Sequence, residues 1–214
     1  MSVRGHTEEA FEETIVASML GAGWLAGQQD HYDRELALDT AHLFEFVGRT
    51  QADTWETLIA YSGGDQDLAQ REFARFLARE IDTRGALDVL RNGVKDRGVR
   101  IHLAYFRPAH TVAEDALVEY RANRLSVTRQ LAYSTTEPGR ELDLVLFVNG
   151  IPVATAELKN PLTGQTVENA KHQYRTDRDP KELLFARRAL VHFAVDPDLV
   201  FLTTRLRGAK THFL

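Results

Sequence analysis

Two acidic residues and a lysine near the middle of the sequence have the types and the spacing that suit metal-assisted hydrolysis. Asp143 stands before an apolar segment, and Glu157 and Lys159 stand two residues apart beyond it. Two carboxylates can hold a divalent cation, because hard cations prefer oxygen ligands. A lysine ammonium beside them can orient a water molecule or offset the charge of a phosphate. The set meets the needs of metal-assisted phosphodiester hydrolysis.

A β-hairpin must position these three side chains. The segment 141–159 contains two apolar, β-prone runs, and the Asn149-Gly150 pair between them is a strong signal for a tight turn. Residues two apart on a strand share a face of the sheet, so Glu157 and Lys159 point the same way. Leu158 between them then points into the core.

The register of the hairpin decides whether Asp143 joins the other two residues. A turn of two residues would pair Asp143 with Ala156 and face it away from Glu157. A bulged loop of three residues, 148–150, with its glycine in the left-handed conformation, would pair Asp143 with Thr155. Asp143 and Glu157 would then be diagonal neighbours on one face. We predict the three-residue loop, because only that register assembles the site.

Spacing alone is weak evidence for a catalytic site, because acidic residues and lysines are common at exposed strand ends. The surrounding sequence is more specific. The informative segments are residues 123–130, 144–153, 157–161, 173–178, 190–196 and 203–204. These segments resemble the PD-(D/E)xK nuclease motif in its type I restriction enzyme form, as in the N-terminal nuclease domain of the R (restriction) subunit.

The resemblance implies a Mg²⁺-dependent DNA endonuclease domain that hydrolyses phosphodiester bonds. Asp143 and Glu157 match the family's metal-binding acids. Lys159 matches its catalytic lysine, and Gln173 matches a glutamine that assists catalysis. The implied partners are double-stranded DNA and the methyltransferase (M) and specificity (S) subunits of a type I restriction complex.

The sequence departs from the family pattern at two positions. Leu142 stands before Asp143, where the motif has proline. The family's Gln-x-x-x-Tyr motif is half present, because Gln173 fits but Asp177 stands where the tyrosine would be. The role of Gln173 therefore stays open.

An amphipathic helix predicted over residues 7–20 offers one more acidic ligand. Glu8 and Glu12 fall within its apolar arc. A carboxylate on an apolar stripe is costly to bury unless it is paired or bound to a metal. The resemblance implies that one acid of this helix approaches the metal, and we prefer Glu12. The alternative is a partly exposed helix end that is favoured by the N-terminal dipole.

Composition narrows the class of protein. The chain has 214 residues, no cysteine and a formal net charge of −5. The lack of cysteine excludes disulfides and thiolate metal sites, and no apolar run is long enough for a membrane span, so we expect a cytoplasmic protein without a membrane partner. The negative charge predicts weak DNA binding by this domain alone. No G-x-x-x-x-G-K-[ST] phosphate loop is present, so ATP would act only through segments outside this chain.

These patterns predict an α/β fold with a mixed β-sheet flanked by helices and a helical N-terminal region. Residues 1–98 are expected to be mainly helical and to include the first helix of the nuclease core, and residues 99–214 to form that core. We interpret the whole as one structural domain, expected to be a fragment of a longer chain. The predicted helices cover residues 40–47, 53–61, 67–81, 86–92, 112–121 and 166–178. The strands predicted outside the hairpin cover residues 99–106, 125–133, 189–195 and 199–204.

Two other functions fit the same residues. One is a stand-alone PD-(D/E)xK nuclease of repair or recombination. The other is a non-catalytic docking module that tethers a motor to the methyltransferase core, in which the acidic pair is only structural. The geometry of Asp143, Glu157 and Lys159 is the observation that bears most directly on this choice.

Overall fold

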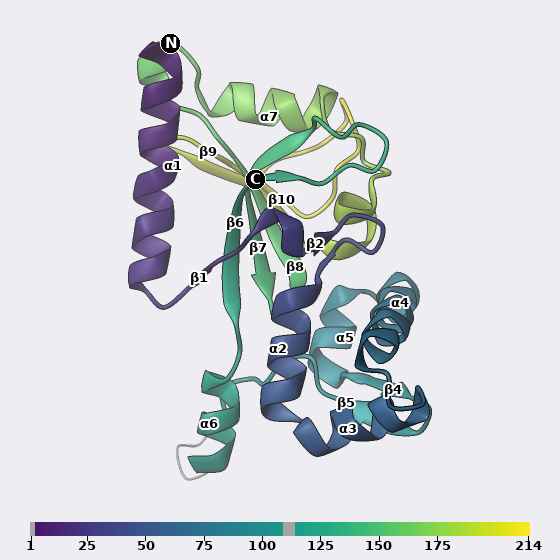
Figure 1. The fold of residues 1–214 in the computed structure, drawn as a ribbon. Coiled ribbons are helices and arrows are strands. Elements are labelled where there is room, and N and C mark those ends of the chain that lie inside the picture. Colours follow the sequence, from purple (N-terminus) through teal and green to yellow (C-terminus); the bar gives the residue numbers. More distant parts are fainter. Residues whose placement is uncertain (1–2, 109–113) are drawn as a thin grey trace.

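A six-stranded mixed sheet organises the α/β fold, and helices flank it (Figure 1). The computed structural model describes residues 3–108 and 114–214. In spatial order the strands are β1 Leu25–Ala26, β6 Leu125–Ala132, β7 Glu141–Val148, β8 Ile151–Leu158, β9 Val191–Val195 and β10 Val200–Thr203. The pairs β1–β6 and β8–β9 are parallel, and the other neighbours are antiparallel. The predicted fold class is confirmed.

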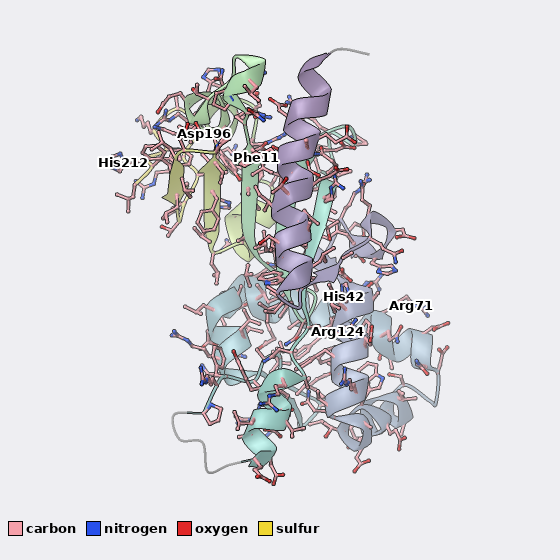
Figure 2. The ribbon with its side chains drawn as sticks, turned by 90° about the vertical axis from the view of Figure 1, so that its left-hand side faces the viewer. Phe11, His42, Arg71, Arg124, Asp196 and His212 are labelled. Carbon is pink, nitrogen blue, oxygen red and sulfur yellow. The ribbon has the colours of Figure 1, made fainter. Side chains whose placement is uncertain are left out.

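The two faces of the sheet are covered by different helices. α1 (Val3–Gly21) packs its Val16 against Leu144, Ala156 and other residues of β6–β8, and Figure 2 looks onto α1 as it crosses the strands. α7 (Val167–Thr176) covers the opposite face, where its Tyr174 packs in one core cluster with Val145. Because side chains alternate along a strand, the neighbours Leu144 and Val145 serve opposite cores.

The hairpin turn differs from the prediction. Val148 pairs directly with Ile151, so the turn consists of Asn149 and Gly150 alone. Both residues have positive φ, 50° and 80°, as the tight turn that favours Asn-Gly requires. The predicted three-residue loop is therefore wrong.

A β-bulge inside β8 shifts the pairing of β7 with β8 by one residue, a shift that the two-residue turn does not provide. Phe147 pairs with Pro152, whereas Leu146 pairs with Ala154, so Val153 is the extra residue. Pro152 lies beside the bulge, where a residue without an N–H is tolerated within a sheet. The bulge moves every later pair by one position.

A helical lobe lies beyond the turn end of the hairpin (Figure 1). Its apolar cluster includes Phe46, Phe73, Leu77 and Ile81. Its helices are α2 Thr40–Thr50, α3 Ala52–Tyr61, α4 Gln66–Arg84 and α5 Ala86–Asn92. Two short sheets accompany them, made of β2 Tyr32–Asp33 with β3 Leu38–Asp39 and of β4 Val94–Asp96 with β5 Val99–Ile101. The strand predicted over 99–106 is thus wrong in length, since β5 has three residues and pairs only with β4.

The hairpin turn is inserted into this lobe. Asn149 is fully buried, and its Nδ2 donates to the carbonyl oxygen of Leu103 at 2.8 Å, while its Oδ1 accepts from the backbone N–H of Arg124 at 2.6 Å. A Cβ on Gly150 would stand 2.2 Å from the carbonyl oxygen of Asp39, so only glycine fits. The turn therefore anchors the hairpin to the lobe, and the opposite end of the hairpin carries the acidic residues.

The remaining elements complete the chain. α6 (Glu114–Arg121) agrees with the helix predicted over 112–121, of which residues 112 and 113 lie outside the described residues. Short 3₁₀ turns cover Gln29–His31 and Pro161–Thr163, and a π-helical turn covers Leu184–Arg188. In the described parts of the chain, no helix has both the length and the apolar character needed to cross a membrane.

Candidate active site

Asp143 and Glu157 lie at the end of the hairpin opposite the turn. Leu144 pairs with Ala156, and this register continued by one residue places Asp143 opposite Glu157. The Oδ2 atom of Asp143 accepts from the backbone N–H of Leu158 at 2.6 Å, which holds the aspartate against β8. The two acids are therefore neighbours, through the bulge rather than through the predicted loop.

Glu157 is fully buried. Its Oε1 accepts from Nε of Arg178 at 2.6 Å, whereas its Oε2 has no hydrogen-bond partner among the described residues. Burial raises the pKa of Glu157 to about 8, and the negative charge of Asp143 adds to this rise. Arg178 and Lys159 act in the opposite direction, since their positive charges lower the pKa of Glu157.

Lys159 follows the end of β8. It is 8 % exposed, and its backbone N–H donates to the carbonyl oxygen of Val195 at 2.8 Å, so the chain is still held to β9 here. The charge of Lys159 acts on Glu157, as two-residue spacing on one strand predicts. The structure thus brings Asp143, Glu157 and Lys159 into one electrostatic group.

Gln173 lies on α7, on the side of the sheet where Glu157 is buried. Its Oε1 is buried without a hydrogen-bond partner among the described residues. Asp177, in the place of the family's tyrosine, is exposed and accepts from the hydroxyl of Thr176 at 2.8 Å. Tyr174 instead points into the sheet, where its hydroxyl lies 2.8 Å from Oγ1 of Thr155.

Arg178 is a site residue that sequence reasoning missed. Arg178 is only 6 % exposed and points inward. Besides Glu157 it bonds the carbonyl oxygen of Glu141 at 2.7 Å, and its guanidinium lies 5.7 Å from the ring centre of Tyr133. No spacing rule links Arg178 to Glu157, because they are 21 residues apart in the sequence.

Glu12 faces the same end of the sheet from α1. It is 5 % exposed, and it binds Arg129 through Oε1 and the Nε2 of Gln130, at 2.5 Å, through Oε2. Two consecutive strand residues reach the same carboxylate because the backbone of Gln130 has a positive φ of 46°. Burial of Glu12 on an apolar helix face is thus accompanied by pairing, one of the two outcomes that the sequence left open.

A cavity of about 310 Å³ connects Glu12 with the hairpin. It is lined by Glu8, Glu9, Glu12, Arg129, Gln130, Asp143 and Leu158. Among the side chains that the structure describes, no three of His, Cys, Asp or Glu gather as a metal-binding group. The structure therefore brings Glu12 and Asp143 to one cavity, with the oxygens of Glu12 engaged by Arg129 and Gln130.

Comparison with protein families shows which family the chain belongs to. A model of the type I restriction enzyme R protein N-terminus matches residues 6–210, which span nearly all of α1, the helical lobe and the whole sheet. Comparisons with curated proteins and with solved structures found no match. The chain therefore belongs to the family of type I restriction enzyme R protein N-terminal regions.

Proposed function

We propose that this chain is the Mg²⁺-dependent DNA endonuclease domain of a type I restriction enzyme R subunit. The observation that carries the proposal is the register of β7 and β8, which, continued by one residue past Leu144 and Ala156, puts Asp143 opposite Glu157, while Lys159 directly follows the end of β8. Two acids and a lysine at one end of a buried hairpin are the set that metal-assisted phosphodiester hydrolysis requires.

The donor set suits a magnesium ion. Mg²⁺ in enzymes is commonly bound by one or two carboxylates and completed by water and by substrate phosphate, so a third acid is not required. Asp143 and Glu157 would supply the carboxylates, and the unpartnered Oε2 of Glu157 fits this role. Glu12 would join as a ligand only on release from Arg129. When bound, the ion would polarise the scissile phosphate and make a water molecule more acidic.

The other residues act around that pair. Arg178 holds Oε1 of Glu157 and fixes the direction of the carboxylate. The ammonium of Lys159 would orient the attacking water or balance charge on the phosphate, and Gln173 would assist from α7. Double-stranded DNA is the proposed substrate, and the M and S subunits are the proposed partners. ATP would be used by segments outside this chain.

Calorimetric titration with Mg²⁺ or Mn²⁺ tests the division of roles. Asp143→Ala and Glu157→Ala should each lose most of the metal affinity, because each removes ligand oxygens. Lys159→Ala should retain the metal, while DNA cleavage by the reconstituted enzyme disappears and its ATP hydrolysis continues. Glu141→Ala is the matched control, since Glu141 is an exposed acid on the same strand.

Two outcomes contradict the proposal. Loss of metal binding in Lys159→Ala as severe as in Asp143→Ala would show that the roles are misassigned. Normal cleavage by Lys159→Ala would show that the site is elsewhere.

One observation favours a second candidate, the non-catalytic docking module. The buried pair of Glu157 and Arg178 can be purely structural, because buried ion pairs occur outside active sites. That function predicts no metal binding by the wild-type chain and unchanged cleavage when Asp143 or Glu157 is replaced in the complete enzyme.

A further inference from the structure

A cavity of about 790 Å³ lies where the helical lobe meets the sheet. The junction of α4 and α5 at Gly85 forms part of its wall, and the segments before β9 and after β10 form the rest. Neither Asp143, Glu157 nor Lys159 lines it, and it shares no lining residue with the cavity beside Asp143.

Arginines dominate the charge of this cavity. Arg187, Arg188, Arg205 and Arg207 line it, and no acidic residue is among the described residues of its wall. Arg187, Arg205 and Arg207 are exposed, and none of the three forms an ion pair within the described parts of the chain. The chain as a whole carries a net charge of −5, so this cluster does not follow from a basic composition.

Arg188 gives the cluster a buried member. It is 1 % exposed, its Nη1 bonds Asp82 at 2.5 Å, and its Nε bonds the carbonyl oxygen of Leu36 at 3.0 Å. Its Nη2 is buried and has no hydrogen-bond partner among the described residues. A buried donor without a partner is costly, so an acceptor at this wall would stabilise the arrangement.

The chemistry of the cluster selects the class of ligand. Guanidinium groups match the oxygens of phosphate in paired hydrogen bonds, and several of them together repel one another until an anion enters. We propose that this arginine pocket binds a phosphate group, either of a free nucleotide or of a nucleic-acid backbone. The pocket joins the helical lobe to the sheet, so the ligand would contact both.

Calorimetry on the full 214-residue chain tests the pocket, with inorganic pyrophosphate and a short DNA duplex at low salt as the two probes. Arg205→Ala and Arg207→Ala should each weaken pyrophosphate binding about tenfold, the effect of losing a charge-assisted hydrogen bond. Arg100→Ala is the matched control, since Arg100 is an exposed arginine of β5 in the lobe, and it should change the affinity less than twofold.

The duplex identifies the source of the phosphate. Equal losses for duplex and pyrophosphate assign the pocket to the nucleic-acid backbone, and losses for pyrophosphate alone assign it to a free nucleotide. Glu157→Gln should leave pyrophosphate binding unchanged, so failure of the proposed nuclease site would not mimic failure here. The proposal is overturned if pyrophosphate and duplex do not bind, if Arg100→Ala weakens them equally, or if an oligoglutamate peptide binds the pocket in their place.

Discussion

At the scale of single residues, the candidate site is a balance of buried charges. Glu157 is buried beside Asp143, and Arg178 and Lys159 offset the two negative charges. The sequence alone could single out Asp143, Glu157 and Lys159 as candidate site residues, because their spacing along strands is regular. Arg178 could not be assigned, since its approach depends on how the chain turns after α7.

Replacing Arg178 should make metal-free protein less stable by an amount that depends on pH. Burial raises the folded-state pKa of Glu157 from its ordinary 4.5 to about 8, so Glu157 reduces stability as pH rises from 4.5 to 8. Arg178→Gln removes a charge that lowers this pKa and leaves the ionised carboxylate unpaired. Urea unfolding in EDTA should show a loss of about 3 kcal/mol at pH 9 and a smaller loss at pH 6, where Glu157 is protonated.

Arg140→Gln is the control for this prediction. It removes the same charge from an arginine that pairs with Glu137 on the surface, and it should change stability little at either pH. A loss for Arg178→Gln that is independent of pH would indicate a packing role for Arg178 instead.

At the scale of elements, periodic patterns were predictable and irregular ones were not. The helices and the hairpin follow from apolar spacing and from the Asn149-Gly150 signal. β1 has two residues, too few for any period to show. The bulge at Val153 arises from pairing between two strands, so one strand's sequence does not reveal it. Continued past Leu144 and Ala156, the register would put Asp143 opposite Glu157, whereas the cavity on the α1 side is lined by Asp143 and not by Glu157, so the shared face of the two acids stays a prediction.

The fit of the hairpin turn into the lobe predicts an unequal pair of glycine substitutions. Gly150→Ala should destabilise the protein by at least about 2 kcal/mol more than Gly64→Ala. Both glycines have similar positive φ, 80° and 84°, but only a Cβ on Gly150 would meet other atoms, the closest 2.2 Å away. Chemical denaturation of both variants measures the difference, and equal losses would show that the turn is not held by the lobe.

At the scale of the whole molecule, burial of a histidine in the core makes the free energy of unfolding depend on pH. His192 is completely buried under α7, and burial lowers its pKa to about 4 from 6.5. Its Nδ1 lies 2.8 Å from Oγ1 of Thr155, and its Nε2 has no partner among the described residues. His192 therefore binds a proton much more readily in the unfolded chain than in the folded chain.

Stability should consequently fall as pH is lowered from 6.5 towards 4. In this window the unfolded chain binds a proton at His192 that the folded chain does not, and the full loss is about 3 kcal/mol. His192→Asn should remove this part of the slope, whereas Glu157 contributes a slope of the opposite sign in both proteins. Unfolding free energies of the two proteins between pH 4 and 7 isolate the histidine, and parallel curves would contradict its role.

The buried turn of the hairpin also decides where the chain can accept new sequence. Tight turns between strands are ordinarily good places for peptide insertions and for spectroscopic labels, but the contacts of Asn149 and Gly150 close this one. The connection from β6 to β7 is the open alternative, since residues 135–139 are exposed. It leads directly into the strand that carries Asp143. A probe attached there would sit beside the acidic end of the hairpin without disturbing the joint between sheet and lobe.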